Sequence, residues 1–270
     1  MAKALYLFYW SSAVFEKKRK ENYGDLLSPF IVEKVSQKAV RFYNAPRRLK
    51  KWFEPQYLMA IGSIMSYSSA RAHVWGSGII SRKDRVQGGK FYAVRGPLTR
   101  KRLSEQGHSC PEIYGDPALL LPRYYWPEVP KKYEYGIIPH YVDYERVSKT
   151  RDTTPDMCVI DLMTDNLQAT TDKILQCKRV ISSSLHGVII AHAYGIPAIW
   201  VRFSEGLSGD NVKFEDYFLS VHIRPYIGED LDYVVSRQKA DALLKKYPSL
   251  PKKDRITILQ DGLINAFPRL

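Results

Sequence analysis

Short apolar runs alternate with segments of helical periodicity along the first half of the chain. Runs bounded by glycine, serine or charged residues are typical of buried strands. The predicted strands are residues 5–10, 58–61, 73–75 and 91–94. Two helices are predicted among them, one over residues 97–106 and one that opens at Ser28, with Pro29 at its first position.

The second half repeats this alternation. The predicted strands are residues 135–138, 157–162, 179–182 and 198–201. The predicted helices are residues 165–177, 187–194, 236–246 and 252–266. Strands that alternate with helices predict parallel sheets with helical crossovers, which is an α/β fold.

A proline-rich stretch separates the two halves. Pro122, Pro127 and Pro130 lie within nine residues, and proline continues neither a helix nor a central strand. We therefore predict two Rossmann-like, doubly wound domains that face each other across a cleft. Residues 1–125 form the first domain and residues 131–250 the second, while residues 251–270 form a C-terminal helix that packs back on the first domain.

Composition excludes several classes of protein. Apolar residues make up 45% of the chain and aromatic residues 13%, more than a disordered chain carries. No run approaches the roughly 18–20 apolar residues of a membrane-spanning helix. The apolar residues 5–10 are followed closely by charged residues, with no small-residue cleavage site, so a buried strand is expected there instead of a signal peptide. Three cysteines form neither a disulfide framework nor a zinc site, so we expect a cytoplasmic protein.

The charge balance favours an anionic partner. The chain has 41 Lys and Arg against 28 Asp and Glu, a formal net charge of +13. The densest cluster, residues 47–53, joins four basic residues to Trp52 and Phe53. It suits the inner face of an anionic membrane or a lipid-linked substrate, although a solvated loop is the simpler interpretation. Because no nucleic-acid-binding signature accompanies the charge, nucleic acid is not expected as a partner.

Polar and glycine-rich segments fall where the predicted strands end, and backbone amides and helix N-termini at such positions hold anions. In the segment around Asn22, Gly24 and Asp25, the side chains are expected either to bind hydroxyl groups in the cleft or to form an ordinary capped loop. Two further segments follow strands, and neither has the spacing of a dinucleotide-binding loop. These segments are Gly62-Ser63 and Gly76-Ser77-Gly78.

Arg95 and His186 are the strongest candidates for chemistry. Arg95 ends a predicted strand, where its guanidinium would grip a carboxylate or phosphate or else form a structural salt bridge. Ser183, Ser184, Leu185 and His186 occupy a strand-to-helix junction, where the helix N-terminus lowers the pKa of the imidazole. His140 ends another strand and is an even choice between a functional and a packing role. The chain lacks a G-x-S-x-G elbow, so a hydrolase triad is not expected.

Taken together, these segments resemble the polysaccharide pyruvyl transferase family. The matching pieces run in order from Asn22 to about Tyr217, with residues 114–118, 195–198 and 213–217 extending the segments above. The resemblance implies a GT-B-like fold, with the acceptor on the N-terminal side and the donor on the C-terminal side. It also implies transfer of a carboxyethylidene group from phosphoenolpyruvate to a capsular, exopolysaccharide or lipid-linked sugar, forming a cyclic ketal.

Site residues follow from the same resemblance. The family's donor-site Arg falls on Arg95 and its donor-site Leu-His on Leu185-His186. Several members have Arg immediately before this pair, where this chain has Ser184; we expect Lys213, in preference to Arg202, to supply the second cation. The expected donor-binding set is completed by Ser183, Gly76 and Ser77. The expected acceptor-binding set is Asn22, Gly24, Gly62, Ser63 and His140.

The predicted mechanism uses acid–base catalysis without a metal or cofactor. His186 is the first choice for general acid or base, and Asp25 is the candidate partner, with their two roles interchangeable. Two other functions stay open. One is a nucleotide-sugar glycosyltransferase of the same architecture, and the other is a non-enzymatic, membrane-peripheral component of glycan assembly.

Overall fold

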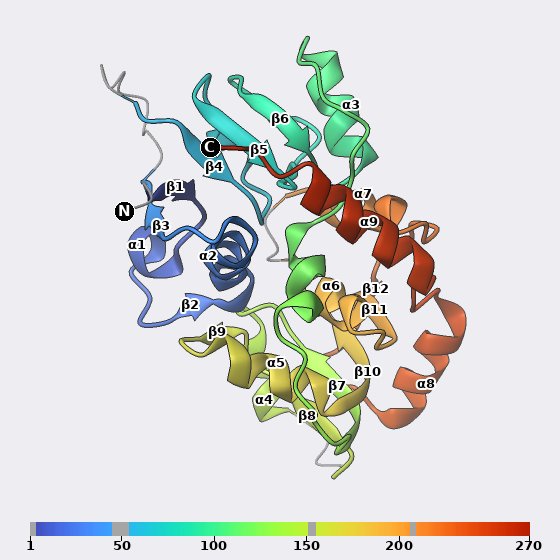
Figure 1. Ribbon diagram of the computed structural model, residues 1–270. Helices are drawn as coiled ribbons and strands as arrows, with labels where there is room; N and C mark the ends of the chain where they lie inside the picture. Colours follow the sequence, from blue (N-terminus) through green and yellow to red (C-terminus); the bar gives the residue numbers. More distant parts are fainter. Residues whose placement is uncertain (1–3, 45–53, 151–154, 206–208) are drawn as a thin grey trace.

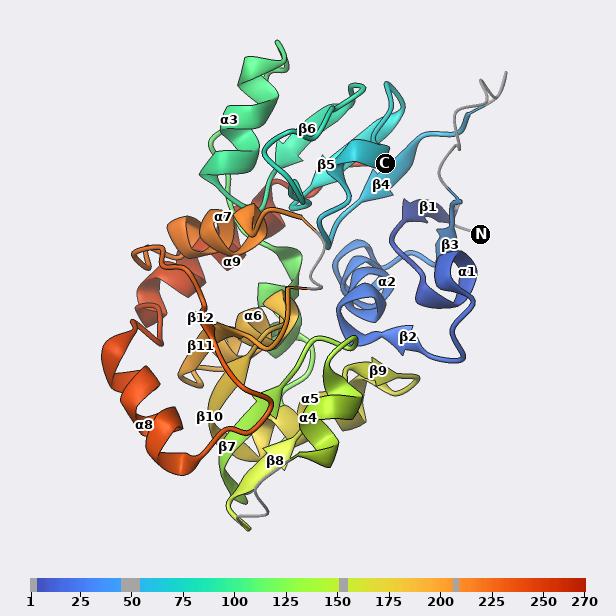
Figure 2. The same cartoon turned by 180° about the vertical axis from the view of Figure 1, so that it is seen from behind.

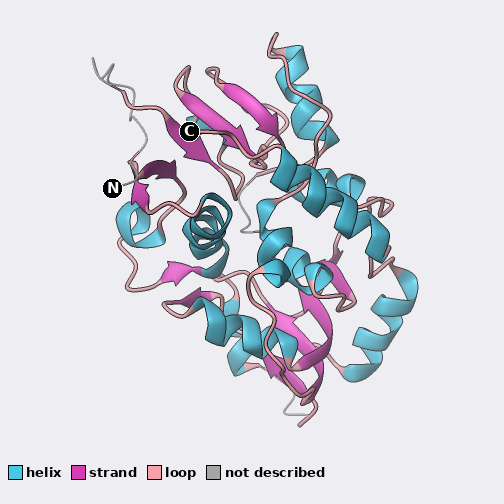
Figure 3. Cartoon of the chain, in the orientation of Figure 1, coloured by secondary structure: helices cyan, strands magenta, loops and turns pink. Residues whose placement is uncertain are grey.

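The computed structural model describes residues 4–44, 54–150, 155–205 and 209–270. Two five-stranded parallel sheets form its framework, one from each half of the chain (Figure 1; Figure 3). The first sheet has the order β3-β1-β4-β5-β6. Its strands are β1 (Leu5–Phe8), β3 (Val40–Phe42), β4 (Tyr57–Met59), β5 (Ala72–Trp75) and β6 (Lys90–Ala93). The basic-aromatic residues 47–53 lie outside the described residues.

The second sheet has the order β12-β11-β10-β7-β8. Its strands are β7 (Tyr133–Ile138), β8 (Met157–Val159), β10 (Cys177–Ser182), β11 (Ala198–Arg202) and β12 (Glu229–Asp230). A small antiparallel pair, β2 (Glu21–Asn22) with β9 (Met163–Thr164), connects the two halves. The parallel α/β architecture expected from the sequence is confirmed.

The two sheets share one topology. In each, the first strand along the chain lies between the second and the third, and the later strands extend the sheet on the side of the third. Strand order therefore reverses between β1 and β4 in the first sheet and between β7 and β10 in the second. In open parallel sheets of this kind, ligands bind beyond the carboxyl ends of the two strands at this switch point. The fold thus supplies two neighbouring strand-end crevices.

Helices fill the space between and around the sheets (Figure 3). Most of them belong to the second half, where they connect successive strands. They are α1 (Ser12–Glu16), α2 (Tyr23–Ser36), α3 (Pro97–Glu105), α4 (Tyr144–Lys149), α5 (Leu167–Leu175), α6 (Leu185–Ala193), α7 (Val212–Ser220), α8 (Arg237–Lys246) and α9 (Lys253–Asn265). Two 3₁₀ segments are η1 (Met65–Tyr67) and η2 (Pro117–Arg123). No helix within the described ranges is long and apolar enough to cross a lipid bilayer.

Helix α2 begins six residues earlier than the sequence predicts. The Asn22 side chain caps it by accepting a hydrogen bond from the Gly24 amide at 2.9 Å, so Asn22 and not Ser28 is the N-cap. Pro29 lies inside the helix, where its ring removes the bond to the carbonyl of Asp25. Ser28 is instead buried, and its Oγ accepts a hydrogen bond from the Ile61 amide. Because the helix starts early, residues 23–25 form its first turn instead of a loop.

One apolar core runs through both halves. A single cluster of buried residues joins α2 and the first sheet to α6 and the second sheet, with Leu119, Leu120 and Leu121 of η2 between them. The proline-rich stretch thus begins directly after the buried Leu121, and it is partly exposed from Pro122 onward, with Trp126 67% exposed. The division into separate domains stays a prediction.

The last helix returns to the first sheet. Helix α9 packs against η2, and the C-terminus lies beside β4 and β5 (Figure 1; Figure 2). The Trp75 indole on β5 donates a hydrogen bond to the carbonyl of Leu263 at 2.7 Å and meets the Phe267 ring edge-on. Gln260 donates to the carbonyl of Leu119. Residues 253–267 therefore cover part of the core that the first half builds.

Candidate active site at the two switch points

A cavity of about 350 Å³ lies where the carboxyl ends of the switch-point strands of both sheets meet. The segments after β1 and β4 contribute one side, and those after β7 and β10 contribute the other. Helices α2 and α7 complete the walls. The lining residues are Trp10, Ser12, Glu16, Asn22, Asp25, Gly62, Ser63, Ile64, Ser66, Tyr67, Ile80, His140, Tyr141, Ser184, Leu185, His186 and Lys213.

His186 is the second residue of α6 and reaches the cavity from the end of β10. Burial, together with the nearby positive charges of Lys213 and Arg95, lowers its pKa to about 3. The imidazole is therefore neutral near pH 7. Its Nε2 atom is buried and has no hydrogen-bond partner among the described residues. A buried ring nitrogen without a partner is available to a ligand.

Gly24 is required by this imidazole. A Cβ atom at position 24 would lie 2.0 Å from His186 Nδ1, a distance that no side chain tolerates. The residue was expected to contact the acceptor, but it instead gives the His186 ring room against the first turn of α2. Residues far apart in the chain, at 24 and 186, thus form one wall.

Asp116 is a neighbour of His186 to which the sequence pattern assigned no role. It caps η2 by accepting a hydrogen bond from the Ala118 amide with Oδ1. Its Oδ2 atom has no hydrogen-bond partner among the described residues and lies 3.9 Å from His186 Nε2, too far for a hydrogen bond. Burial raises the pKa of Asp116 to about 6. A small movement of the His186 ring would join the two groups into a carboxylate–imidazole pair.

Lys213 lies on α7 and lines the cavity beside His186. Burial and the charge of Arg95 lower its pKa to about 8, so it stays largely protonated near pH 7. It makes no ion pair with any described residue. Arg202, the alternative weighed from the sequence, pairs with Asp230 and is not part of the cavity lining.

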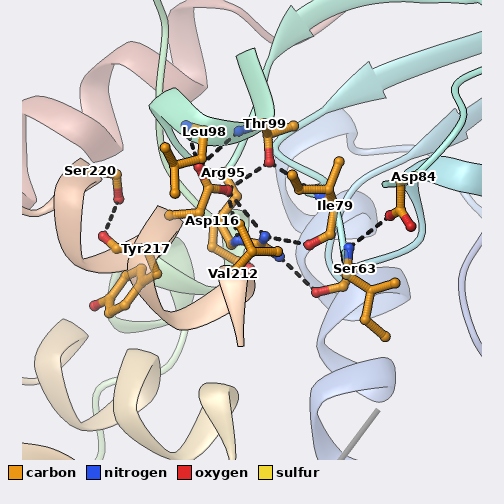
Figure 4. A network of polar contacts seen from close by, with 12 residues as sticks. Ser63, Ile79, Asp84, Arg95, Leu98, Thr99, Asp116, Val212, Tyr217 and Ser220 are labelled. Carbon is orange, nitrogen blue, oxygen red and sulfur yellow. Dashed lines mark hydrogen bonds and ion pairs between the residues drawn. The ribbon is translucent and has the colours of Figure 1, made fainter. Parts of the chain in front are cut away.

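Arg95 is not among the residues that line the cavity. Figure 4 shows it within a network of polar contacts that includes Ser63 and Ile79. The sequence suggested a guanidinium that grips the donor, but the side chain is fully buried and its donors are occupied. Nε and Nη2 contact Asp216 Oδ2 at 3.1 Å, Nη2 also donates to the Ile79 carbonyl, and Nη1 donates to Ser63 Oγ at 2.7 Å. The structural salt bridge, which the sequence left open, is what forms.

Asp216 organises the segment that follows Arg95. Its Oδ1 accepts hydrogen bonds from the amides of Leu98 and Thr99, and its Oδ2 accepts one from the Thr99 hydroxyl. The carboxylate of α7 therefore caps the N-terminus of α3. Gly96 permits this contact, because a Cβ there would lie 2.0 Å from the Asp216 carbonyl oxygen.

Among the other expected residues, Gly62, Ser63, Ser184 and Leu185 line the cavity. Ser183 lies just outside the lining, where its Oγ accepts a hydrogen bond from the His140 amide at 2.7 Å. It thereby fixes the turn that carries His140 into the cavity. Burial and the charges of Lys213 and Lys18 lower the pKa of His140 to about 3.

Gly76 and Ser77 were expected to bind the donor, but they do not line the cavity. Gly76 has φ +95°, and a Cβ there would lie 2.3 Å from the Pro117 ring. Ser77 is buried and donates to the Ala60 carbonyl at 2.9 Å. Both residues serve the packing of the first sheet.

Asn22 and Asp25 lie at the start of α2 and both line the cavity. The Asn22 carboxamide oxygen is occupied by the helix cap described above. The Asp25 carboxylate has no hydrogen bond to any described residue. Burial and the charges of Glu21 and Glu16 raise the pKa of Asp25 well above its usual range. Such a carboxyl group can carry a proton near neutral pH.

One wall of the cavity was missed at the level of sequence. Trp10, Glu16, Tyr67 and Tyr141 come from three separate segments, after β1, in η1 and after β7. Each looks like an ordinary strand end or turn in the sequence. Their position directly after switch-point strands, or one turn beyond, was the available signal.

Comparison with known proteins bears on this site. A family model described as polysaccharide pyruvyl transferase matches residues 86–205, which include Arg95, Asp116 and His186. An uncharacterized protein of Acanthamoeba polyphaga mimivirus is 34% identical over 222 residues, covering 80% of this chain and 74% of the viral protein. The crystal structure of an uncharacterized Klebsiella pneumoniae protein is similar with a TM-score of 0.45 and 11% identity, covering 80% of this chain and 87% of that one.

Proposed function

The chain belongs to the polysaccharide pyruvyl transferase family, and from this we propose that it transfers a pyruvyl group from phosphoenolpyruvate to a saccharide. The product is a cyclic carboxyethylidene ketal, and phosphate is released. The observation that carries the proposal is one cavity lined by a cationic side chain, Lys213, a neutral imidazole, His186, and a carboxyl group, Asp25, whose pKa is raised by burial.

Phosphoenolpyruvate carries a carboxylate and a phosphate, and the Lys213–His186 side of the cavity suits such an anion. Lys213 supplies a charge without an ion-pair partner in the described part of the chain. Because α6 begins at Leu185, its first amides point towards the same place with a positive dipole. Arg95 adds positive charge from beneath and donates a hydrogen bond to Ser63 Oγ, so the Ser63 hydroxyl keeps its own proton to donate to a ligand.

The raised pKa of Asp25 and the lowered pKa of His186 favour one assignment of roles. Asp25 carries a proton and delivers it to the methylene carbon, which becomes a methyl group and makes the adjacent carbon electrophilic. A sugar hydroxyl attacks that carbon and gives its proton to the neutral His186. A second hydroxyl then displaces phosphate, which leaves with the proton held by His186, while the proton of the second hydroxyl returns to Asp25. Each such proton transfer is worth roughly two to four orders of magnitude in rate.

The setting follows from the same proposal. The two sheets form a GT-B-like arrangement, with the donor held mainly by the second half and the acceptor approaching from the first. No resident metal or cofactor takes part. The acceptor is a polymeric or lipid-linked sugar reached at the cytoplasmic face of the membrane, and residues 47–53 supply contact with anionic lipid.

The proposal is tested by incubating the protein with phosphoenolpyruvate and a panel of oligosaccharides, and by following phosphate release and the mass of the sugar. A ketal adduct that requires His186 and Asp25 is expected. Calorimetry with phosphoenolpyruvate and with nucleotide sugars provides the control. Binding of a nucleotide sugar without binding of phosphoenolpyruvate would replace this proposal with a glycosyltransferase.

A further inference from the structure

We propose that Trp10, Tyr67, Tyr141 and Glu16, here called the aromatic wall, form the subsite for the acceptor, and that this subsite takes an uncharged sugar ring in preference to a uronic acid. This inference rests on the proposed function, since it names the class of saccharide that function requires. Two observations carry it, the shape of the wall and the distribution of charge along the cavity.

The aromatic wall presents amphipathic rings whose positions are fixed from behind. The Trp10 ring stacks on Phe15 at 4.6 Å and lies 5.8 Å from Tyr67, at an angle of 51°. Its indole N–H donates to Glu16 Oε1 at 2.8 Å, and the Tyr141 hydroxyl donates to the same carboxylate. Because the Trp10 and Tyr141 rings are held by one carboxylate, they lose little freedom when a ligand arrives. Sugar rings present C–H groups on their faces, and aromatic rings of this kind pack well against them.

Polar groups beside the rings suit hydroxyls. Ser12 Oγ is buried, lines the cavity and has no hydrogen-bond partner among the described residues. Burial raises the pKa of Glu16, but hydrogen bonds from Lys18 and Trp10 outweigh this, so the carboxylate stays ionised. Hydroxyl groups both donate and accept, and they can therefore satisfy Ser12 and the remaining lone pairs of Glu16.

Charge changes sign along the cavity. His186 responds to the charges of Lys213 and Arg95, whereas Asp25 responds to those of Glu21 and Glu16. His140 lies between, because its pKa responds to Lys213 on one side and to Lys18 and Glu16 on the other. One end of the cavity is thus cationic, while the other carries carboxylates.

The cationic end is suited to the donor, and Lys213 is the one lysine or arginine among the described residues that line the cavity. Lys18, beside the aromatic wall, is paired with Glu16 at 2.9 Å and lies over the Tyr141 ring. A uronate placed on this wall would face Glu16 without a positive partner and would be repelled. The wall therefore selects an uncharged ring.

Ligand-detected NMR tests the subsite without requiring turnover. Methyl glycosides of galactose, glucose and mannose are compared with their C6-oxidised uronates. At least one neutral glycoside is expected to bind, at least about tenfold more tightly than its uronate, and Trp10→Ala is expected to weaken binding about tenfold. Tyr67→Ala provides a second variant whose half-exposed ring can be removed with less risk to folding. Trp126→Ala, an exposed indole away from the cavity lining, is the matched control and is expected to bind normally.

Three results would overturn the inference. These are equal binding of uronates and neutral glycosides, unchanged binding in both Trp10→Ala and Tyr67→Ala, and no binding of any neutral glycoside. Glu16→Gln adds a sharper readout, because it is expected to reduce the discrimination against uronates. If neutral glycosides bind at this wall but phosphoenolpyruvate neither binds nor releases phosphate, the subsite stands and the pyruvyl transfer fails.

Discussion

The two halves of the molecule have the same strand order but use their strand ends differently. In the second half, His140 and His186 follow the switch-point strands β7 and β10 and enter the cavity. In the first half, Arg95 follows β6 at the edge of the sheet, where Asp216 from α7 neutralises it. The difference teaches that a polar residue after a parallel strand reaches the cavity when that strand borders the switch point. At the sheet edge, such a residue instead pairs with the other half of the molecule, as Arg95 does with Asp216.

Replacing His186 is expected to have the largest effect. His186→Ala should lower the turnover of pyruvyl transfer by roughly two to four orders of magnitude, because the proton acceptor is lost. Thermal unfolding should show that the protein stays folded. His108→Ala removes an imidazole outside the cavity and is the control. Near-normal turnover in the His186 variant would mean that the strand ends of the second half do not supply the group that accepts the proton.

Breaking the Arg95–Asp216 pair is expected to affect stability first. Either Arg95→Ala or Asp216→Ala leaves an unpaired buried charge and should lower the free energy of unfolding by about 3–5 kcal/mol, measured in urea. Replacing both residues by leucine should be less costly than the two single losses combined. Lys149→Ala, in an exposed pair with Glu145, should change stability little. A stable Arg95→Ala protein that has lost only binding of phosphoenolpyruvate would place Arg95 in the donor site after all.

Lowering the pH should reveal the buried imidazole of His186 through a loss of protein stability. The folded-state pKa of His186 is about 3, below its ordinary value of 6.5. Its contribution to stability is therefore fully present above about pH 6.5 and is lost as the pH falls towards 3. In that window this group lowers the unfolding free energy by about 1.4 kcal/mol per pH unit.

Urea unfolding of the native protein and of His186→Gln, at several pH values between about 7 and 5, measures this term as a difference between the two proteins. The advantage of the native protein should shrink with falling pH. A difference that does not change with pH would mean that the imidazole titrates as in water.

Ser63→Ala is expected to have the smallest effect and to sharpen the comparison. Ser63 is the place where Arg95 of the sheet edge touches the cavity. Loss of its hydroxyl should weaken binding of phosphoenolpyruvate by about 1 kcal/mol, measured by calorimetry. Ser77→Ala removes a hydroxyl on the same sheet outside the cavity and should leave that affinity unchanged. If both variants bind phosphoenolpyruvate with the same affinity, the first half of the molecule takes no part in binding the donor.

Much of the fold was predictable because each buried parallel strand is a short apolar run in the sequence, and because the helices between the strands have a periodic apolar pattern. The predicted strands overlap β1, β4, β5, β6, β7, β8, β10 and β11, with ends that differ by a few residues. The elements that were not predicted are strands β2, β3, β9 and β12 and helices α1, α4 and α7. Asn211, which precedes α7, has φ +66° and no side-chain cap bond, so the usual start signal is missing.

Several residues of the site could be predicted from the sequence, but the contacts that they make could not. His186, Lys213, Asp25 and Ser63 were expected from the sequence, and they meet in one cavity. The burial of Arg95 was not decided by the sequence, because its partner lies 121 positions away on another element. Long-range pairs of this kind depend on how the two sheets dock, and no local pattern encodes that.

The return of α9 to the first sheet has a consequence for synthesis of the chain. The indole of Trp75 donates its hydrogen bond to the carbonyl of Leu263, and Gln260 donates one to the carbonyl of Leu119. During synthesis on the ribosome, the side of the first sheet that α9 covers therefore stays exposed until almost the whole polypeptide has emerged. Vectorial folding cannot finish the first half first; the last helix completes it.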